Sequence, residues 1–497
     1  LNASRYTASS TLQRMELLKT GYMGTLSLGW DNYLFLELTG RQERSSTLKD
    51  QSFFYPSANL SFLFSNAFRM PAWWNHGKLR LSYGVVGNAP ETYAANIIYE
   101  QGSDNGFTWN YVPSSWGNAN IRPEKKYEYE IGFESKFLNN RLGFDVSYYN
   151  NRVKDQILST PQPSTSGVKY VLMNVGEVAN EGWDISVSAT PVLTKNFRWD
   201  LTANYGIYRN KVVKLADGVP YLEISNIGGG GAKIQAVEGR PMGDIYVQVP
   251  QMNENGEYLV SDKGLYMNQT ELQRVGNINP DGVGGLFSSF SYKNIFLDFS
   301  IDFRIGGDVI NEMYQYSTAS GLTPESLQFR DTEHGGLSYY YPGNNNASGV
   351  PVQVDPSLGA GPNGETVYHD GVILPGVVAS TGEKNTRIIP AGYYYNQTYN
   401  WGTQPEQLTY RHSVFDNSYV KLRELTIGYQ FPEKLISKLG MTRLSVSVFG
   451  RNLFYFYKAL KNYDAESSVG TSWASQAVVG GSTTATRNFG VSLRASF

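Results

Sequence analysis

The stretch Ile295-Phe-Leu-Asp-Phe-Ser-Ile-Asp-Phe-Arg304 alternates apolar and polar residues with a period of two. Side chains along a β-strand point alternately to its two faces, so this segment predicts a strand with one apolar and one polar face. The C-terminal stretch Asn488–Phe497 repeats the pattern, with Phe489, Val491 and Leu493 on the apolar face. One or two such strands would also fit a soluble sandwich. The number of segments and their connections therefore decide the fold.

Segments with this alternation recur along the whole chain, and most are about 10 residues long, the length of a strand in a membrane-spanning barrel. Their apolar faces are rich in Tyr, Phe and Leu, and their other faces carry Ser, Asp, Glu, Arg and Gly. The predicted strands are 21–30, 32–43, 57–66, 77–87, 124–138, 140–152, 180–191, 196–209, 283–292, 294–305, 418–431, 441–454 and 485–497.

The connections between these segments are alternately short and long. Tight polar turns are expected at Asp31-Asn32, Asn139-Asn140, Lys195-Asn196 and Lys293-Asn294, with slightly longer ones at 67–76 and 432–440, the latter as a short helical turn. The opposite connections are the loops 44–56, 88–123, 153–179, 210–282, 306–417 and 455–484. Short turns on one side and long loops on the other are typical of outer-membrane barrels with the loops outside the cell. The sequence thus predicts an all-β, antiparallel transmembrane barrel.

The composition of the 497 residues agrees with this fold. No run of about 18 apolar residues is present, so the sequence predicts no transmembrane helix. Aromatic residues make up 14%, with 36 tyrosines, which fits aromatic girdles at the two membrane interfaces. A net charge of −2 gives no electrostatic basis for binding nucleic acid, and the absence of cysteine excludes disulfides, thiolate catalysis and cysteine metal sites.

Short motifs at the strand ends occur in a fixed order over nearly the whole chain. They are Leu38-Thr-Gly-Arg41, Ser45-Ser-Thr-Leu48, Tyr55-Pro-Ser57, Gly77-Lys-Leu-Arg-Leu-Ser-Tyr-Gly84, Arg122-Pro-Glu124, Glu130-Ile-Gly132, Asn140-Arg-Leu142, Tyr148-Tyr149, Asn174-Val-Gly176, Asn180-Glu-Gly182, Gly284-Gly285, Tyr292-Lys293, Tyr419-Val-Lys-Leu-Arg423, Gly428-Tyr429 and Arg451-Asn-Leu-Phe454. In this order and spacing the motifs resemble the SusC/RagA family of TonB-dependent outer-membrane transporters. One departure is Asp464-Ala-Glu466, where the family leads us to expect Asp-Pro-Glu.

The resemblance implies a 22-stranded barrel in the bacterial outer membrane with an N-terminal plug in its lumen. Such transporters import large nutrients with energy delivered by TonB, and a SusD-like surface lipoprotein caps the barrel. Residues 1–497 are then expected to be the C-terminal barrel portion, with thirteen strands and no plug. The N-terminal portion would be a separate chain or a preceding segment, and Leu1 would lie in an extracellular loop. The resemblance also allows a dimer of such complexes.

Loop aromatics are the candidate substrate-binding residues, because aromatic faces stack on sugar rings and pack peptide side chains. Packing of the loops, or of a lipoprotein lid, is the alternative for each. The candidates are Trp109, Trp116, Trp401, Trp473, Tyr339, Tyr340 and Tyr341. Trp73 and Trp74 lie on the short-turn side, where we expect a membrane interface. The terminal Phe497 resembles the assembly signal of outer-membrane barrels.

Other chemistry-bearing motifs have simpler explanations. Ile227–Lys233 lacks the Gly-Lys-Ser/Thr of a phosphate-binding loop, and His76, His334, His369 and His412 show no metal-ligand spacing. The acidic turn Asn253–Glu257 lacks the regular oxygen ligands of a calcium loop, although a bound cation remains the alternative. The carboxylates Glu128, Glu130, Asp145, Asp184, Asp298 and Asp302 fall on polar strand faces and are expected to face the lumen.

These observations predict an importer of oligosaccharides or oligopeptides, with no enzymatic activity, no cofactor and no bound metal. Lipid and the SusD-like lipoprotein are the expected partners, and loops 210–282 and 306–417 are expected to form an extracellular platform for the lipoprotein. A passive porin and an outer-membrane barrel enzyme are the alternatives. The enzyme would need a nucleophile and a base, and the sequence shows no Gly-x-Ser-x-Gly elbow.

Overall fold

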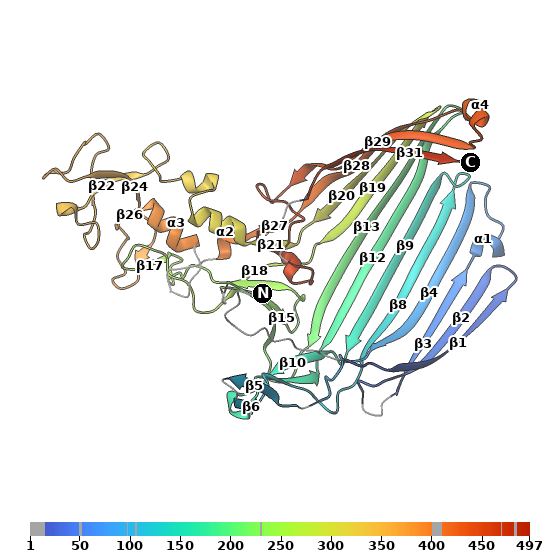
Figure 1. Ribbon diagram of the computed structural model, residues 1–497, viewed down its shortest axis with the longest axis horizontal. Helices are drawn as coiled ribbons and strands as arrows, with labels where there is room; N and C mark the ends of the chain where they lie inside the picture. Colours follow the sequence, from blue (N-terminus) through green and yellow to red (C-terminus); the bar gives the residue numbers. More distant parts are fainter. Residues whose placement is uncertain are drawn as a thin grey trace. The chain divides into compact units, whose positions relative to one another are not determined.

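The thirteen long strands of the chain form one sheet in a computed structural model (Figure 1). The structure describes residues 15–48, 52–96, 98–104, 107–228, 231–399, 410–468, 470–481 and 485–497. In sheet order, the strands are β1 (Lys19–Trp30), β2 (Leu34–Ser45), β3 (Ser52–Phe62), β4 (Trp74–Asn88), β8 (Glu124–Phe137), β9 (Leu142–Lys154), β12 (Glu177–Leu193), β13 (Phe197–Lys214), β19 (Gly282–Tyr292), β20 (Ile295–Ile305), β28 (Tyr419–Gln430), β29 (Arg443–Lys458) and β31 (Asn488–Ser496). Every predicted strand is therefore present, and the predicted all-β meander is confirmed. No helix in the described part of the chain is long and apolar enough to cross a membrane.

The bounds of β3 correct the prediction. The sequence places this strand at 57–66 and a loop at 44–56, but β2 continues to Ser45 and β3 begins at Ser52. Phe53 is 5% exposed and packs with Leu48 and Ile121, which draws the start of the strand into a small core. The predicted end of the strand is instead the helical turn α1 (Phe64–Ala67).

Two of the four predicted tight turns have the backbone that their residues predict. Asp31 and Asn32 have φ values of 45° and 56°, and Asn139 and Asn140 have 58° and 62°. Two consecutive residues with positive φ give the tight turn whose twist matches paired strands, and Asn and Asp tolerate that backbone best. The predicted turn at 432–440 contains α4 (Glu433–Ile436) and ends at Gly440, with φ of 70°.

The chain forms two compact units, each containing a part of the sheet. Unit 1 comprises residues 1–188 and 209–220, and unit 2 comprises residues 189–208 and 221–497. Neighbouring strands within each unit pair in antiparallel fashion, as the registers of β8 with β9 and of β19 with β20 show. In each unit the short turns lie at one end of the strands and the long loops at the other (Figure 1).

The register of unit 1 aligns apolar side chains across neighbouring strands. Leu81 on β4 lies opposite Ile131 on β8, and Ile131 lies opposite Tyr148 on β9. A similar row on the first three strands is formed by Leu28, Leu36 and Leu60. Leu81 and Ile131 are 39% and 47% exposed, so this apolar face is not the core of a sandwich. It is the face that a barrel turns toward lipid.

Unit 2 repeats the arrangement. Leu297 on β20 lies opposite Ile427 on β28, and Ile427 lies opposite Val448 on β29. Val448 in turn lies opposite Val491 on β31. Ile427, Val448 and Val491 are 54%, 59% and 71% exposed. The predicted apolar face is therefore one row of outward-facing side chains from strand to strand in this unit as well.

The loops are folded rather than irregular, which the sequence does not predict. Their strands are β5 (Glu100–Asp104), β6 (Phe107–Tyr111), β7 (Ser115–Trp116), β10 (Ile157–Pro161), β11 (Tyr170–Asn174), β14 (Tyr221–Ile227), β15 (Ala232–Val237), β16 (Asp244–Val247), β17 (Leu259–Val260), β18 (Gln273–Asn277), β21 (Asp308–Asn311), β22 (Leu337–Tyr340), β23 (Val352–Gln353), β24 (Val367–Val372), β25 (Val377–Val378), β26 (Ile389–Pro390), β27 (Val414–Asp416) and β30 (Val478–Val479). The helices are α2 (Glu312–Ala319) and α3 (Ala391–Tyr399).

Three loops of unit 2 pack together into what we call the loop body, the described residues of 221–281, 306–417 and 459–484. Ile234 and Ile245, both 0% exposed, share a core with Ile310 from the second loop and Val478 from the third. The parallel pairing of β17 with β25 joins the first two loops directly. Because its core draws on segments far apart in the sequence, the loop body can hold a defined surface.

Candidate functional site

The polar face of unit 1 carries a network of ion pairs across three strands. Arg80 on β4 donates to Asp145 on β9 at 2.6 Å and also lies 3.5 Å from Glu134 on β8. His76 and Lys136 each lie 3.7 Å from the same Glu134 carboxylate. These side chains alternate with the apolar row along their strands, so they occupy the face opposite to lipid. Asp145 therefore lies on the polar face of the sheet, together with the charged side chains around it.

Two further predicted lumen carboxylates, Glu128 and Asp298, also have polar partners. Glu128 pairs with Lys126 at 2.6 Å, and Asp298 accepts a hydrogen bond from the Ser289 hydroxyl at 2.6 Å. Such pairing explains these carboxylates without catalysis.

Three of the sequence motifs meet at one cluster in unit 2, which we call the Glu466 cluster. Glu466 contacts Lys421 and Arg423 of the Tyr419–Arg423 motif, and its Oε1 lies 2.6 Å from Arg423 Nη2. Arg423 also donates to Asp302 at 2.5 Å and to Asn452 of the Arg451–Phe454 motif at 3.0 Å. The cluster therefore joins strands β20, β28 and β29 to the loop after β29.

A β-bulge aims Arg423 into this cluster. The register of β28 with β20 and with β29 shifts at Arg423, which leaves that residue outside both ladders. A bulge bends its strand and redirects the extra side chain, so the guanidinium reaches acidic partners from two directions. Lys421, which is 2% exposed, lies with its Nζ 4.7 Å from the centre of the Tyr455 ring.

The loop after β29 contributes Asp464-Ala-Glu466 to the cluster, the motif that replaces the expected Asp-Pro-Glu. Asp464 accepts hydrogen bonds from the Tyr455 hydroxyl at 2.6 Å and from the Ala485 amide at 2.9 Å. Burial opposes ionisation of Glu466, yet the hydrogen bonds from Arg423 and Lys421 lower its pKa below the ordinary value for a glutamate. The pKa of Asp464 is lowered in the same way, with burial outweighed by hydrogen bonds from Tyr455 and backbone amides.

The candidate aromatic residues belong to both units of the chain, and those that the structure describes are taken unit by unit. Trp109 on β6 is 47% exposed and covers Gly102 of the paired strand β5. Trp116 on β7 is partly buried, and its ring nitrogen has no hydrogen-bond partner in the described part of the chain. Both belong to unit 1. Trp401 lies outside the described residues, as does Leu1.

The remaining candidates belong to the loop body. Trp473 is 39% exposed and lies over Gly243, where an added Cβ would come within 2.9 Å of the ring. Tyr339 on β22 is only 1% exposed, because its ring stacks on Tyr368 with centroids 5.5 Å apart. Burial and the charge of Asp370 raise the pKa of Tyr339. Tyr339 therefore packs the loop in this conformation.

Tyr340 and Tyr341 are less covered than Tyr339. Both are intermediate in exposure, and the Tyr341 ring meets the Tyr339 ring edge-on with centroids 5.6 Å apart. Burial is the main cause that raises the pKa of Tyr341. These two rings remain candidates for contact with a ligand at the surface of the loop body.

The glycine-rich segment 227–233 connects the antiparallel strands β14 and β15. Lys233 lies on β15 and pairs with Glu223 at 2.6 Å, an arrangement unlike a phosphate-binding loop. In the turn 253–257, the Asn253 side-chain oxygen accepts from the amides of Asn255 and Glu257 at 3.0 and 2.9 Å.

The histidines of unit 2 each have their own surroundings. His334 contacts Asp331 at 2.7 Å, and His369 contacts the Ser338 hydroxyl at 2.9 Å. Burial and the nearby charge of Arg411 lower the pKa of His412. Among the described residues, no group of three or more His, Asp or Glu side chains is placed to hold a metal.

Trp73 and Trp74 lie at the turn ends of the strands, where the sequence predicts an interface. Their rings stack with centroids 5.9 Å apart, and Trp73 stacks equally closely on Phe137. Phe64 meets Trp74 edge-on at 5.5 Å. Phe497 follows β31 and is 82% exposed. In unit 1, the rings of Phe64, Trp73, Trp74 and Phe137 thus form an aromatic band at one rim of the apolar face.

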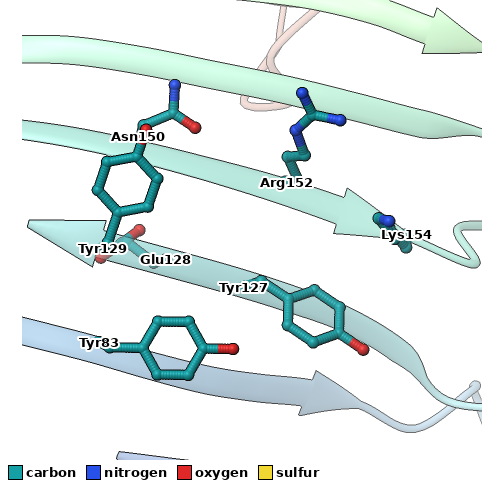
Figure 2. A pocket seen from close by; sticks show the side chains of 7 residues that line it. All are labelled: Tyr83, Tyr127, Glu128, Tyr129, Asn150, Arg152 and Lys154. Carbon is teal, nitrogen blue, oxygen red and sulfur yellow. The ribbon is translucent and has the colours of Figure 1, made fainter. Parts of the chain in front are cut away.

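The sequence does not single out a second aromatic group at the loop ends of the same face. Tyr83, Tyr127 and Tyr129 line a shallow cavity of about 210 Å³ with Asn150 and Arg152 (Figure 2). The sequence contains a signal for this group, because Tyr127 and Tyr129 occupy the alternate positions of β8 that continue the apolar row beyond Ile131. Reading each strand for a change from aliphatic to aromatic residues would have found it.

Comparison with known proteins shows which proteins the chain is similar to. The family model of the TonB dependent receptor-like β-barrel matches residues 3–245. TonB-dependent receptor P3 of Formosa agariphila is 22% identical over 494 residues, covering 90% of this chain and 42% of the relative. TonB-dependent receptor SusC of Bacteroides thetaiotaomicron is 27% identical over 256 residues, covering 45% of this chain and 24% of the relative. The chain thus spans less than half the length of these relatives.

The fold is also that of a solved transporter structure. The RagAB peptide transporter superposes with a TM-score of 0.67 at 18% identity, covering 96% of this chain and 47% of that one. The named relatives are receptors and transporters rather than enzymes, in agreement with the sequence prediction. The predicted location in the outer membrane is likewise that of the family. The chain is therefore similar to the β-barrel portion of TonB-dependent receptors, among them SusC, and it shares its fold with the RagAB transporter structure.

Proposed function

We propose that the chain forms barrel wall and extracellular loops of an importer for oligosaccharides or oligopeptides, energised by TonB through a plug in the N-terminal portion. The observation that carries the proposal is the division of the sheet into an exposed apolar face and a charged face. A charged face of this kind suits contact with a plug and with polar cargo. The RagAB neighbour is described as a peptide transporter, which makes oligopeptides the first cargo to test.

The exposed loop aromatics are the proposed cargo contacts. Trp109 and Trp473 present 47% and 39% of their surfaces, enough for a sugar ring or an apolar peptide side chain to pack against. Trp116, Tyr340, Tyr341 and Trp401 remain in the proposed set, and Tyr339 would support Tyr341 from below. The Glu466 cluster would hold in position the third loop, which carries Trp473.

A SusD-like surface lipoprotein is the proposed partner of the loop body, and two such complexes would form the proposed dimer. The loop body carries several large apolar side chains at its surface, including Leu322, Val350 and Leu358, which are 78%, 60% and 43% exposed. Exposed apolar side chains on a well-folded surface often mark a protein interface. Phe497 is proposed as the assembly signal of the barrel.

Uptake of labelled oligopeptides and oligosaccharides by cells that express the complete protein tests the function. We expect uptake to stop when a protonophore removes the inner-membrane energy source, whereas a passive porin would continue to admit cargo. Trp109→Ala should lower uptake severalfold. Trp183→Ala is the matched control, because Trp183 is 45% exposed but lies on the apolar face beside Tyr148. Unchanged uptake under the protonophore would refute active import.

The partner is tested separately by removing residues 306–417 and recovering the lipoprotein with the complete protein. Loss of the lipoprotein, with barrel assembly retained, is the expected result. Full recovery of the lipoprotein by the shortened protein would contradict the proposed platform.

A further inference from the structure

The loop ends of β8 and β9 show an ordered change of chemistry along the apolar face. On β8 the outward residues run from Phe133 and Ile131 through Tyr129 and Tyr127 to Lys125. On β9 they run from Val146 and Tyr148 through Asn150 to Arg152 and Lys154. The order is apolar, then tyrosine (followed by Asn150 on β9), then cationic. It matches the order of acyl chain, interface and headgroup in a lipid leaflet.

The height of the apolar face on β8 also fits a lipid bilayer. Tyr127 and Phe137 mark its two aromatic rims on β8, and a rise of ~3.3 Å per residue separates them by roughly 33 Å along the strand. A barrel strand tilted by about 40° converts this length to roughly 25 Å along the membrane normal, the height of the apolar band of outer-membrane barrels. The cations at 125, 152 and 154 therefore lie at the level of headgroups.

The cations are placed close together across the strands. Lys125 lies directly opposite Lys154, and Tyr127 lies directly opposite Arg152. Like charges in opposite positions on paired strands repel, which disfavours the Lys125–Lys154 pair unless an anion lies between them. The side chains of Arg152 and Lys154 line the same cavity as three tyrosines, Tyr83, Tyr127 and Tyr129 (Figure 2).

The carboxylates near this group offset only a part of its charge. Glu177 lies 2.9 Å from Arg152 and 3.9 Å from Lys154. Glu181 lies nearer the apolar row and accepts from the Tyr148 hydroxyl at 3.3 Å. Glu128 also borders the cavity, but it belongs to the opposite face and pairs with Lys126. Three cations thus face two carboxylates, and the group keeps a positive charge.

We propose that this group, Lys125, Arg152 and Lys154 above the three tyrosines, binds the phosphate-bearing headgroup of an outer-leaflet lipid. The ammonium and guanidinium groups bind the phosphate, the tyrosine hydroxyls lie at the interface, and the acyl chains lie along Ile131, Phe133 and Val146. Each basic side chain near an anionic membrane surface strengthens such binding appreciably. This lipid site is independent of cargo import and would fix the height of the barrel in the leaflet.

The test uses the complete protein reconstituted in nanodiscs of equal parts phosphatidylglycerol and phosphatidylcholine. Native mass spectrometry of the released protein measures how much of each lipid it retains. We expect the anionic lipid to exceed the neutral lipid, and the double variant K125Q/K154Q to lower that ratio by about tenfold. The control K126Q removes a lysine from the same strand but from the opposite face, and it should leave the ratio unchanged.

Two outcomes would overturn the proposal once circular dichroism shows that the variants retain their strand content. Equal retention of the two lipids by the wild-type protein is the first, and an unchanged ratio in K125Q/K154Q is the second. Inorganic phosphate is the third arm of the test. If phosphate alone bound the detergent-purified protein as tightly as the anionic lipid does, the site would be a free-anion site rather than a lipid site.

Discussion

The ion pairs on the polar face of unit 1 and those of the Glu466 cluster in unit 2 use the same residue types but differ in their exposure. Arg80 and Asp145 leave 27% and 44% of their side chains in contact with solvent. Lys421 leaves 2%, and its partner Glu466 leaves 27%. An open ion pair contributes little to stability, because water competes with each partner. A buried charge that loses its partner is costly, because water cannot replace it.

This difference assigns different roles to the two regions. The open pairs can rearrange at little cost, as contact with the proposed cargo or plug would require. The Glu466 cluster cannot, because Lys421, Arg423 and Asp302 share partners across strands β20 and β28 and the loop after β29. We infer that the cluster fixes the root of the third loop, while the polar face stays adaptable.

The largest effect is expected from Glu466→Ala. This change leaves Lys421 buried without its carboxylate partner, and we expect it to lower the free energy of unfolding by about 3 kcal/mol. The urea midpoint of the complete protein in detergent measures the loss. Arg451→Gln is the control, because its pair with Glu424 is exposed and the change should cost well under about 1 kcal/mol. Equal urea midpoints for Glu466→Ala and Arg451→Gln would contradict the claim that the buried cluster stabilises the protein more than an exposed ion pair does.

Acid should weaken the same cluster without a mutation. The pKa values of Asp464 and Glu466 are lowered in the folded protein, so their stabilising contribution is complete at neutral pH. That contribution starts to fall as the pH drops below the ordinary carboxyl values, and it is lost as the pH falls through the lowered ones. Cleavage of loop 455–484 by an acid-stable protease should therefore increase only in that acidic range. An increase already near pH 6, with no further change below, would show that other groups hold the loop.

The smallest effect is expected from Arg80→Gln on the polar face of unit 1. The open pair with Asp145 should contribute about 0.5 kcal/mol, and the urea midpoint should shift very little. A loss comparable to that of Glu466→Ala would mean that the polar face is a rigid element rather than an adaptable one.

The strands were predictable because their signal is local. The alternation of Ile295–Arg304 and the turn residues Asp31 and Asn139 depend only on neighbours in the sequence. The bounds of β3 were not predictable in this way, because Phe53 is buried by Ile121 from a distant loop. The strands inside the loops are short and pair over long separations, as β17 does with β25.

The candidate site was predictable only in part, for the same reason. Loop aromatics can be listed from the sequence, but the ring that covers Tyr339 belongs to Tyr368 on another strand. The motif residues Lys421 and Arg423 were recognised by their order along the chain. Their partners Asp302 and Glu466 lie on separate segments, so the sequence could not reveal the cluster that they form.

The most direct test of the central claim, that one face of the sheet contacts lipid and the other faces the lumen, is a scan of single cysteines along β20 from Leu297 to Phe303. This chain contains no cysteine of its own, so each introduced thiol can carry a spin label. In the reconstituted complete protein we expect labels at the odd positions to be relaxed by oxygen dissolved in lipid and labels at the even positions by a water-soluble nickel complex. Equal access of both reagents at odd and even positions, or the opposite alternation, would contradict the account.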